Sequence, residues 1–281
     1  MQSTICVHDF NMPRSTKLQS ASHARKKNSA PLIRCVIFDL DDTLYDCMGQ
    51  RVRPAHRHAA KAVVKAGLKA SVEAVYRTRM KAFRVDPILM HIDAEVARKF
   101  HAANPEVLSK IARDAYFNCP VGKLRLFSGT LPLLNMLHTR GVRVFVVTFG
   151  EPQIQKAKVK TLGLEKHPAI DKIFYADRDR LLTKEGAFQV IQQELDLPAD
   201  QVLIVGDRAM SEIRAGNELG MHTVRIRRGE FASQHPQGKI EVADYEVRNI
   251  SKVGKLPFRW GTNSQIHHGD TEARRNQEVR D

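Results

Sequence analysis

Residues 34–44 of the chain read Arg-Cys-Val-Ile-Phe-Asp-Leu-Asp-Asp-Thr-Leu, and this stretch decides the fold. The apolar run 35–38 shows no alternation of polar and apolar side chains, which is typical of a strand buried on both faces of a sheet. Three carboxylates follow within four positions, Asp39, Asp41 and Asp42. Carboxylates this close raise each other's pKa values unless a cation lies among them. We therefore predict a buried strand that ends in a site for a divalent cation.

Strand and helix patterns alternate in the second half of the chain, downstream of Gly129. The expected strands are 142–147, 172–175, 201–205 and 223–226. The expected helices are 130–140, 153–162, 184–195 and 212–219. Continuous apolar strands that alternate with helices imply a parallel sheet with helices on both faces. The predicted fold class is therefore α/β, with a Rossmann-like sheet.

The segment between the first strand and Gly129 has a helical pattern throughout. We expect four helices joined by short connections, which favours a small bundle. Their expected ranges, with Pro54 in a first turn and Ser71 and Asn104 as N-caps, are 54–66, 71–84, 93–102 and 104–118. Because this bundle separates the first two strands of the sheet, we interpret it as an inserted four-helix domain.

These patterns predict the domain organisation of the 281-residue chain. The α/β core comprises residues 32–46 and 126–258, and the helical insertion comprises residues 47–125. Residues 1–31 are rich in Ser, Lys and Arg without apolar periodicity, so we expect a disordered basic arm. Residues 259–281 are polar, and we expect a disordered tail.

Composition narrows the class of protein. The formal net charge is +14, and residues 46–125 alone carry sixteen basic and seven acidic side chains. No apolar run approaches the roughly 20 residues needed to cross a bilayer. The four cysteines have no C-x-x-C spacing, so neither a zinc site nor a redox motif is indicated. We expect a cytoplasmic protein with reduced thiols and no membrane partner.

Further polar residues follow other predicted strands. Thr148 follows the second strand, Lys184 opens the helix after the third, and Asp207 follows Gly206 after the fourth, with Glu212 five residues later. Each of these residues alone is common at a turn or on a surface. Ligands of open α/β sheets bind beside the carboxyl ends of the strands, so together they predict one site with the first carboxylates.

These clusters resemble the motifs of the haloacid dehalogenase superfamily over about residues 32–250. Residues 39–43 are similar to its first motif, D-x-D-x-T, and residues 146–148 are similar to its second motif, a strand that ends in Ser or Thr. Lys184 is similar in position to the lysine of the third motif. Residues 205–207, with Glu212, are similar to the fourth motif. The insertion lies where the capped subclass of that family has its helical cap. The resemblance implies the phosphatase branch, because the dehalogenase branch lacks the acid–base carboxylate at Asp41.

The resemblance also implies roles for these residues. Asp39 is expected to attack phosphorus and form an aspartyl-phosphate, and Asp41 to act as general acid and base. Thr148 and Lys184 are expected to bind the phosphoryl oxygens. The implied cofactor is Mg²⁺, held by the Asp39 carboxylate, the Asp41 backbone carbonyl and Asp207. Glu212 is expected beside these ligands without touching the metal itself.

The chain departs from the family pattern at several positions. Glu212 stands where many relatives have Asp, Glu185 and Gly186 rather than proline follow Lys184, and Arg208 replaces a more usual Ser or Thr. Phe149 stands where Asn or Ser often follows the threonine of the second motif. Three other lysines, Lys156, Lys158 and Lys160, compete with Lys184 for the role of the active-site lysine. We prefer Lys184 because it opens a helix at the distance from the third strand that the family shows.

The predicted function is Mg²⁺-dependent hydrolysis of a phosphate monoester, with a small phosphorylated metabolite as substrate. A phosphomutase would use the same residues and pass the phosphoryl group to a sugar hydroxyl instead of water. A non-catalytic protein that binds nucleic acid or an acidic partner through the basic segment is the alternative from another class. No nucleic-acid partner is expected, because the basic residues alternate with apolar ones as on solvated helix faces.

A basic stretch at the start of the insertion offers candidates for substrate specificity. Arg51, Arg53, His56 and Arg57 follow the first motif closely, where the chain leaves the nucleophile and enters the cap. Arginine binds two oxygens at once, so these residues could recognise a second anionic group on the substrate. The alternative is that they lie on an ordinary solvated face of the helix.

Overall fold

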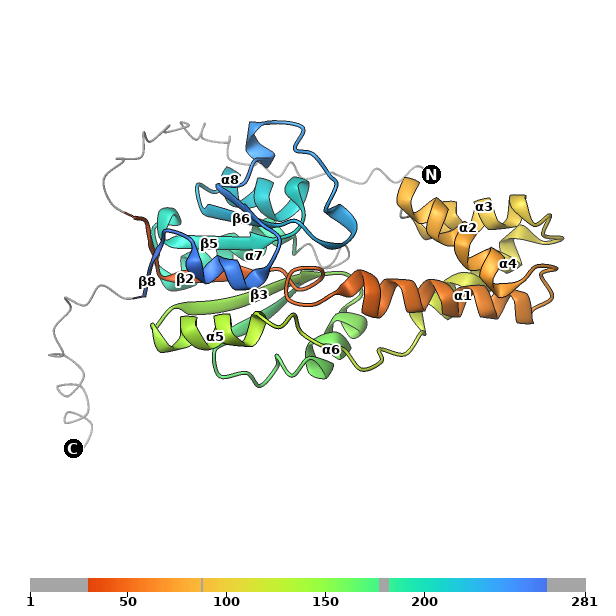
Figure 1. The fold of residues 1–281 in the computed structure, drawn as a ribbon, viewed down its shortest axis with the longest axis horizontal. Coiled ribbons are helices and arrows are strands. Elements are labelled where there is room, and N and C mark those ends of the chain that lie inside the picture. The colour runs from red at the N-terminus through yellow and green to blue at the C-terminus, as the bar shows by residue number, and fades with distance from the viewer. Residues whose placement is uncertain (1–29, 87, 177–181, 262–281) are drawn as a thin grey trace, which may run out of the picture.

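The computed structural model describes residues 30–86, 88–176 and 182–261 (Figure 1). Its centre is a six-stranded sheet in which every neighbouring pair is parallel, in the order β4-β3-β2-β5-β6-β7. The strands are β2 Cys35–Phe38, β3 Arg143–Phe149, β4 Lys172–Ala176, β5 Val202–Gly206, β6 His222–Ile226 and β7 Tyr245–Val247. The predicted α/β fold with a parallel sheet is confirmed. The strand that carries the three carboxylates, β2, lies inside the sheet between β3 and β5.

Helices cover both faces of the sheet (Figure 1). On one face lie α5 Thr130–Thr139 and α6 Pro152–Thr161, and on the other lie α7 Lys184–Leu195 and α8 Arg214–Glu218. The side chains of β2 alternate between the two layers: Val36 and Phe38 pack with Leu134 of α5, and Cys35 and Ile37 pack with Phe188 of α7. All four β2 residues are fully buried, which explains their unbroken apolar pattern.

The bounds of individual elements differ from the prediction in a few places. The first strand is divided into β1 Leu32–Ile33 and β2, and β1 pairs with β8 Arg259–Trp260 in a separate parallel sheet. The predicted start of the tail at residue 259 is therefore wrong, because the Arg259 amide donates to the Pro31 carbonyl at 2.8 Å. The predicted helix 212–219 is a π-helical turn, Ala209–Ile213, followed by α8.

The inserted segment forms four helices as predicted: α1 Arg53–Lys65, α2 Val72–Val85, α3 Leu89–Lys99 and α4 Pro105–Phe117. Two predicted N-caps are present. The Ser71 hydroxyl accepts from the Ala74 amide at 3.2 Å, and the Asn104 side chain accepts from the Val107 amide at 3.1 Å. Apolar residues of α1, α2, α3 and α4 pack into a core of their own. We call these four helices, together with the π-helical turn Met48–Val52 that precedes α1, the helical unit.

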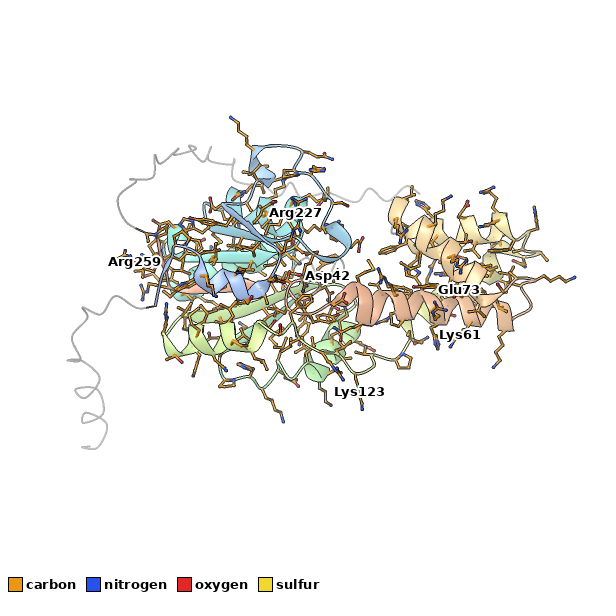
Figure 2. All side chains as sticks on the ribbon, in the orientation of Figure 1. Asp42, Lys61, Glu73, Lys123, Arg227 and Arg259 are labelled. Atoms are coloured by element: carbon orange, nitrogen blue, oxygen red, sulfur yellow. The ribbon has the colours of Figure 1, made fainter. Side chains whose placement is uncertain are left out.

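The helical unit lies at the carboxyl edge of the sheet, to the right of it in Figure 1. A π-helical turn, Met48–Val52, leads into α1 and joins the unit to the loop after β2. Figure 2 shows Asp42 at this junction, and Lys61 and Glu73 on the helical unit itself. No helix within the three described ranges is long and apolar enough to span a bilayer. Most of the predicted basic arm and most of the predicted tail lie outside those ranges.

Candidate active site

A cavity of about 1340 Å³ lies between the carboxyl edge of the sheet and the helical unit. Both parts of the structure contribute to its wall. The residues from the sheet and its loops include Asp39, Asp41, Lys158, Lys184, Asp207 and Glu212, and those from the helical unit include Arg51, Arg113, Tyr116 and Phe117. The structure therefore brings the predicted catalytic carboxylates and Lys184 together in one cavity.

Asp39 lies directly after β2 and is 5% exposed. Its backbone amide donates to the Val205 carbonyl at 2.9 Å, which continues the pairing of β2 with β5. Its carboxylate accepts a short hydrogen bond from the Lys184 ammonium, and the same ammonium bonds Glu212. Burial raises the pKa of Asp39 to about 7, with Lys184 opposing the rise and Glu212 adding to it.

Helix α7 fixes the position of Lys184. Thr183 precedes the helix, and its hydroxyl accepts from the Gly186 amide at 3.0 Å, so Lys184 is the first helical residue. Its ammonium lies between Asp39 and Glu212 and is largely buried. Burial lowers the pKa of Lys184, but the two carboxylates outweigh it and raise the pKa above its ordinary value. Lys184 is therefore a stable cation at the end of β2.

The loop after β5 brings two more carboxylates to the same place. Asp207 is 5% exposed, and its pKa is raised well above the ordinary value by burial and by the charges of Asp39 and Glu212. Glu212 lies against Gly206, where an added Cβ would stand 2.6 Å from the Glu212 Cγ. Only glycine at position 206 leaves room for Glu212 to reach Lys184.

Asp41 is held by three side chains. Lys158 donates to both of its carboxylate oxygens, at 2.9 and 2.8 Å, Tyr45 donates its hydroxyl at 2.8 Å, and Gln155 donates its amide at 3.1 Å. Gln155 and Lys158 lie three positions apart on α6 and so share one face of that helix. Burial opposes the charged form of Asp41, but Lys158 and the hydrogen bonds outweigh it and lower the pKa of Asp41. Asp41 is therefore held as a carboxylate.

Thr148 is close to these groups but is not among the described residues that line the cavity. Its side chain is fully buried in β3, and the amide of Gln155 contacts its hydroxyl. The next residue, Phe149, lines the cavity instead and is 41% exposed. The hydroxyl predicted to bind phosphate is thus covered by Gln155 in this structure.

Asp42, the third carboxylate of the first motif, received no role in the sequence prediction. Its backbone has a φ of 56°, and its carboxylate accepts from the Met48 amide at 3.1 Å and the Glu230 amide at 3.3 Å. Gly229 approaches so closely that an added Cβ would lie 2.1 Å from the Asp42 Cγ. Asp42 therefore ties the start of the helical unit to the loop after β6.

The four specificity candidates lie in different surroundings. Arg51 lines the cavity, whereas Arg53, His56 and Arg57 are not among its described lining residues. Arg57 pairs with Glu73 at 2.8 Å, and Arg53 is exposed. His56 is fully buried inside the helical unit, and burial lowers its pKa to about 3. A helical turn points successive residues in different directions, which is why proximity in sequence did not bring all four to the cavity.

Of the four candidate lysines, two lie in the cavity. Lys158 contacts Asp41, and Lys184 contacts Asp39. Lys156 lies over the ring of Tyr175, with 5.8 Å between its ammonium and the ring centroid, and Lys160 is exposed. Gln155 and Lys158 were not predicted to hold Asp41. The signal in the sequence that could have identified them is their three-residue spacing, which puts both side chains on one face of the helix predicted after strand 142–147.

The donor set suits Mg²⁺ in its chemistry. Asp39, Asp207 and Glu212 carry carboxylate oxygens, the kind of atom that Mg²⁺ prefers, and Lys184 contacts Asp39 and Glu212. Burial raises the pKa of Asp207 beside two further carboxylates, so a divalent cation there would offset repulsion. Within the described ranges no three acidic, His or Cys side chains already converge as metal ligands. Lys184 holds Asp39 and Glu212 in the present arrangement.

The chain is similar in sequence or in fold to several known proteins. A glyceraldehyde 3-phosphate phosphatase of Methanopyrus kandleri is 28% identical over 228 residues, covering 77% of this chain and 93% of the relative. The enzyme of that name from Methanocaldococcus jannaschii is 28% identical over 225 residues, covering 79% of this chain and 96% of the relative. A crystal structure described as a predicted phosphoglycolate phosphatase from Haemophilus somnus shares the fold, with a TM-score of 0.59 at 17% identity over 80% of this chain and 97% of that one.

The model of one protein family matches the chain directly. Residues 33–220 match haloacid dehalogenase-like hydrolases, which is more than half of the 281 residues. The matched range contains both groups of acidic residues, Lys184 and the whole helical unit. The chain therefore belongs to the haloacid dehalogenase-like hydrolase family.

Proposed function

We propose that Asp39 is the nucleophile of a phosphate monoester hydrolase, and that its substrate is a short phosphorylated metabolite of about the size of glyceraldehyde 3-phosphate. The enzyme is a phosphatase of the haloacid dehalogenase type. The observation that carries the nucleophile assignment is the contact of Asp39 with Lys184 inside a cavity that also holds Asp41. A nucleophile held beside a fixed cation, two residues from a second carboxylate, matches covalent phosphoryl transfer.

Two half-reactions follow from this assignment. An Asp39 carboxylate oxygen attacks phosphorus while the bond to the leaving oxygen breaks, and Asp41 gives its proton to that oxygen. Water then attacks the aspartyl-phosphate, Asp41 takes a proton from the water, and inorganic phosphate leaves. Lys184 stabilises the negative charge on the phosphoryl oxygens. The phosphate competes with Asp41 for the ammonium of Lys158, which frees Asp41 to take up the proton it needs for the first step.

We propose Asp39, Asp207 and the Asp41 backbone carbonyl as the Mg²⁺ ligands, with Glu212 beside them. When bound, Mg²⁺ would neutralise charge on the phosphoryl oxygens and on the carboxylates. Asp39 and Asp207 are both buried at the carboxyl ends of neighbouring strands, β2 and β5, which supports their sharing one cation. Thr148 is proposed as a phosphate ligand only after Gln155 turns away from its hydroxyl.

The helical unit is proposed to act as a cap formed by residues 47–125. It supplies one wall of the cavity through Arg51, Tyr116 and Phe117, opposite the nucleophile. A cavity of about 1340 Å³ bounded on both sides admits a small metabolite more readily than a polymer. This supports a small-molecule substrate.

The direct test is release of inorganic phosphate by the purified full chain with Mg²⁺. Glyceraldehyde 3-phosphate and a generic aryl phosphate serve as substrates, with and without a chelator. We expect hydrolysis of both that stops when the metal is removed and is absent in Asp39→Asn. Equal hydrolysis by wild type and Asp39→Asn would overturn the nucleophile assignment.

A further inference from the structure

Arg51 is a buried cation in the wall of the cavity that no part of the proposed reaction uses. The residue is 4% exposed, and its Nη2 donates to the Tyr116 carbonyl at 3.2 Å. Its other two guanidinium nitrogens, Nε and Nη1, are buried and have no hydrogen-bond partner. No carboxylate among the described residues forms an ion pair with it. Burying an unpaired charge is costly, so this arrangement indicates a missing anionic partner.

The other charges on the cavity wall do not supply that partner. Asp39 and Glu212 are bound to Lys184, Asp41 is bound to Lys158, and Asp42 accepts two backbone amides. Glu151, Asp207 and Glu230 also line the cavity, and none of the described acids on its wall forms an ion pair with Arg51. An anionic molecule that enters the cavity would supply the partner that the described residues do not.

A second arginine faces the same space. Arg113 lines the cavity from α4 and is exposed, and it too has no ion pair among the residues that the structure describes. Tyr116 and Phe117, three and four positions later, line the cavity from the same face of the helix. Arg51 is held beside this face by one hydrogen bond to the Tyr116 carbonyl and by its position over the Tyr116 ring, with 5.6 Å between the guanidinium carbon and the ring centroid.

We propose that Arg51, assisted by Arg113, binds a carboxylate on the part of the substrate that leaves, so that the preferred substrate is the phosphate ester of a short hydroxy acid. This inference rests on the proposed phosphatase function and narrows it. The phosphoryl group lies at Asp39 and Lys184, and the carboxylate lies at the opposite wall of the same cavity. Charge-assisted hydrogen bonds from arginine to a carboxylate are strong and directional.

The test uses two esters with the same three-carbon chain. In 3-phosphoglycerate the end opposite the phosphate is a carboxylate, and in glyceraldehyde 3-phosphate it is an aldehyde. We expect wild type to favour the acid in kcat/KM by at least about tenfold, the size of one charge-assisted hydrogen bond. Arg51→Met should abolish that preference, because it should lower kcat/KM for the acid at least about tenfold more than kcat/KM for the aldehyde. No preference in wild type, or an equal loss on both esters in Arg51→Met, overturns the proposal.

Arg53→Met is the matched control. It removes the same charge two positions away, at an exposed residue outside the cavity wall, and should keep the preference for the acid. Arg51→Lys keeps the positive charge, so it separates the effect of losing that charge from a folding defect in Arg51→Met. Thermal unfolding adds a separate readout: Arg51→Met should be at least as stable as wild type, because it removes an unpaired buried charge.

A binding measurement separates failure of this inference from failure of the proposed function. Calorimetry with Asp39→Asn measures affinity for 3-phosphoglycerate without turnover, and Asp39→Asn/Arg51→Met should bind it at least about tenfold more weakly. If an aryl phosphate is hydrolysed but Arg51 affects neither binding nor preference, the inference is wrong and the phosphatase stands. If no ester is hydrolysed but binding depends on Arg51, the carboxylate site stands and the proposed reaction is wrong.

Discussion

The ammonium of Lys158 on α6 contacts both carboxylate oxygens of Asp41, at 2.9 and 2.8 Å. The cavity therefore contains two separate lysine–aspartate pairs, since Lys184 binds Asp39. Each proposed catalytic carboxylate has its own cation, but their other partners differ. Asp39 shares its lysine with Glu212, whereas Asp41 also accepts from Tyr45 and Gln155. This difference gives the two lysines different expected effects.

Lys184→Met is expected to lower kcat/KM by about 10²- to 10³-fold, the cost of removing a preorganised charged donor from the transition state. Lys158→Met should cost less, about tenfold, because Tyr45 and Gln155 still hold Asp41. Lys156→Met is the control on the same helix, since its ammonium lies over Tyr175 outside the cavity wall. Steady-state kinetics on an aryl phosphate provide the measurement. A larger loss for Lys158→Met than for Lys184→Met would reverse the assignment.

Asp39→Asn and Asp41→Asn should both lose at least about a thousandfold in kcat, for different reasons. An amide at position 39 cannot attack phosphorus and is a poorer metal ligand. An amide at position 41 cannot transfer a proton, but the proposed metal contact there is through the backbone. A calorimetric titration with Mg²⁺ should show weaker metal binding in Asp39→Asn only. Weaker Mg²⁺ binding in Asp41→Asn, with turnover preserved, would show that its role is misassigned.

Gly206→Ala should lower activity through Glu212. The new Cβ would stand 2.6 Å from the Glu212 Cγ, so Glu212 has to move away from Lys184. We expect kcat/KM to fall by at least about tenfold and the free energy of unfolding by about 1–3 kcal/mol, as for other overpacked sites. Gly122→Ala, where nothing lies within 4 Å of an added Cβ, is the control and should change neither quantity. Wild-type kinetics in Gly206→Ala would mean that Glu212 can shift without consequence.

His56 should make the helical unit sensitive to acid. Burial and the nearby charges of Arg79 and Arg51 lower its pKa to about 3, from 6.5 in an unfolded chain. His56 is therefore protonated below about pH 6.5 in the unfolded state, but only below about pH 3 in the folded state. Stability should fall as the pH drops through this window, by about 2 kcal/mol between pH 7 and pH 5.

The measurement is urea unfolding of wild type and His56→Gln at several pH values. The variant should be less stable at pH 7, because His56 packs against Phe83 and Tyr116, but the difference should narrow by about 2 kcal/mol at pH 5. His58→Gln, at an exposed position of the same helix, should follow wild type. A difference between wild type and His56→Gln that stays constant with pH would contradict the prediction.

Local sequence determined most of the fold. The unbroken apolar run of β2 predicted a strand covered on both faces, and the N-caps Ser71 and Asn104 are where the sequence placed them. Such signals lie within a few residues of the structure that they specify. Strand β8 was not predicted, because two residues are too few to show a periodic pattern. Its partner strand, β1, also lies more than two hundred positions earlier in the chain.

The sequence by itself also determined which residues carry the proposed chemistry: the carboxylates after β2, Lys184 at the start of α7, and Asp207 after β5. Only the tertiary structure decided their partners. Lys158 lies 117 positions from Asp41, and Gln155 covers Thr148, because α6 packs beside the end of β2. The tertiary structure also decided that Arg51 lines the cavity and that Arg53 and Arg57 do not, because each step along a helix turns the side chain by about 100°. Side-chain direction at a junction between two packed units depends on how the units meet, which no local pattern encodes.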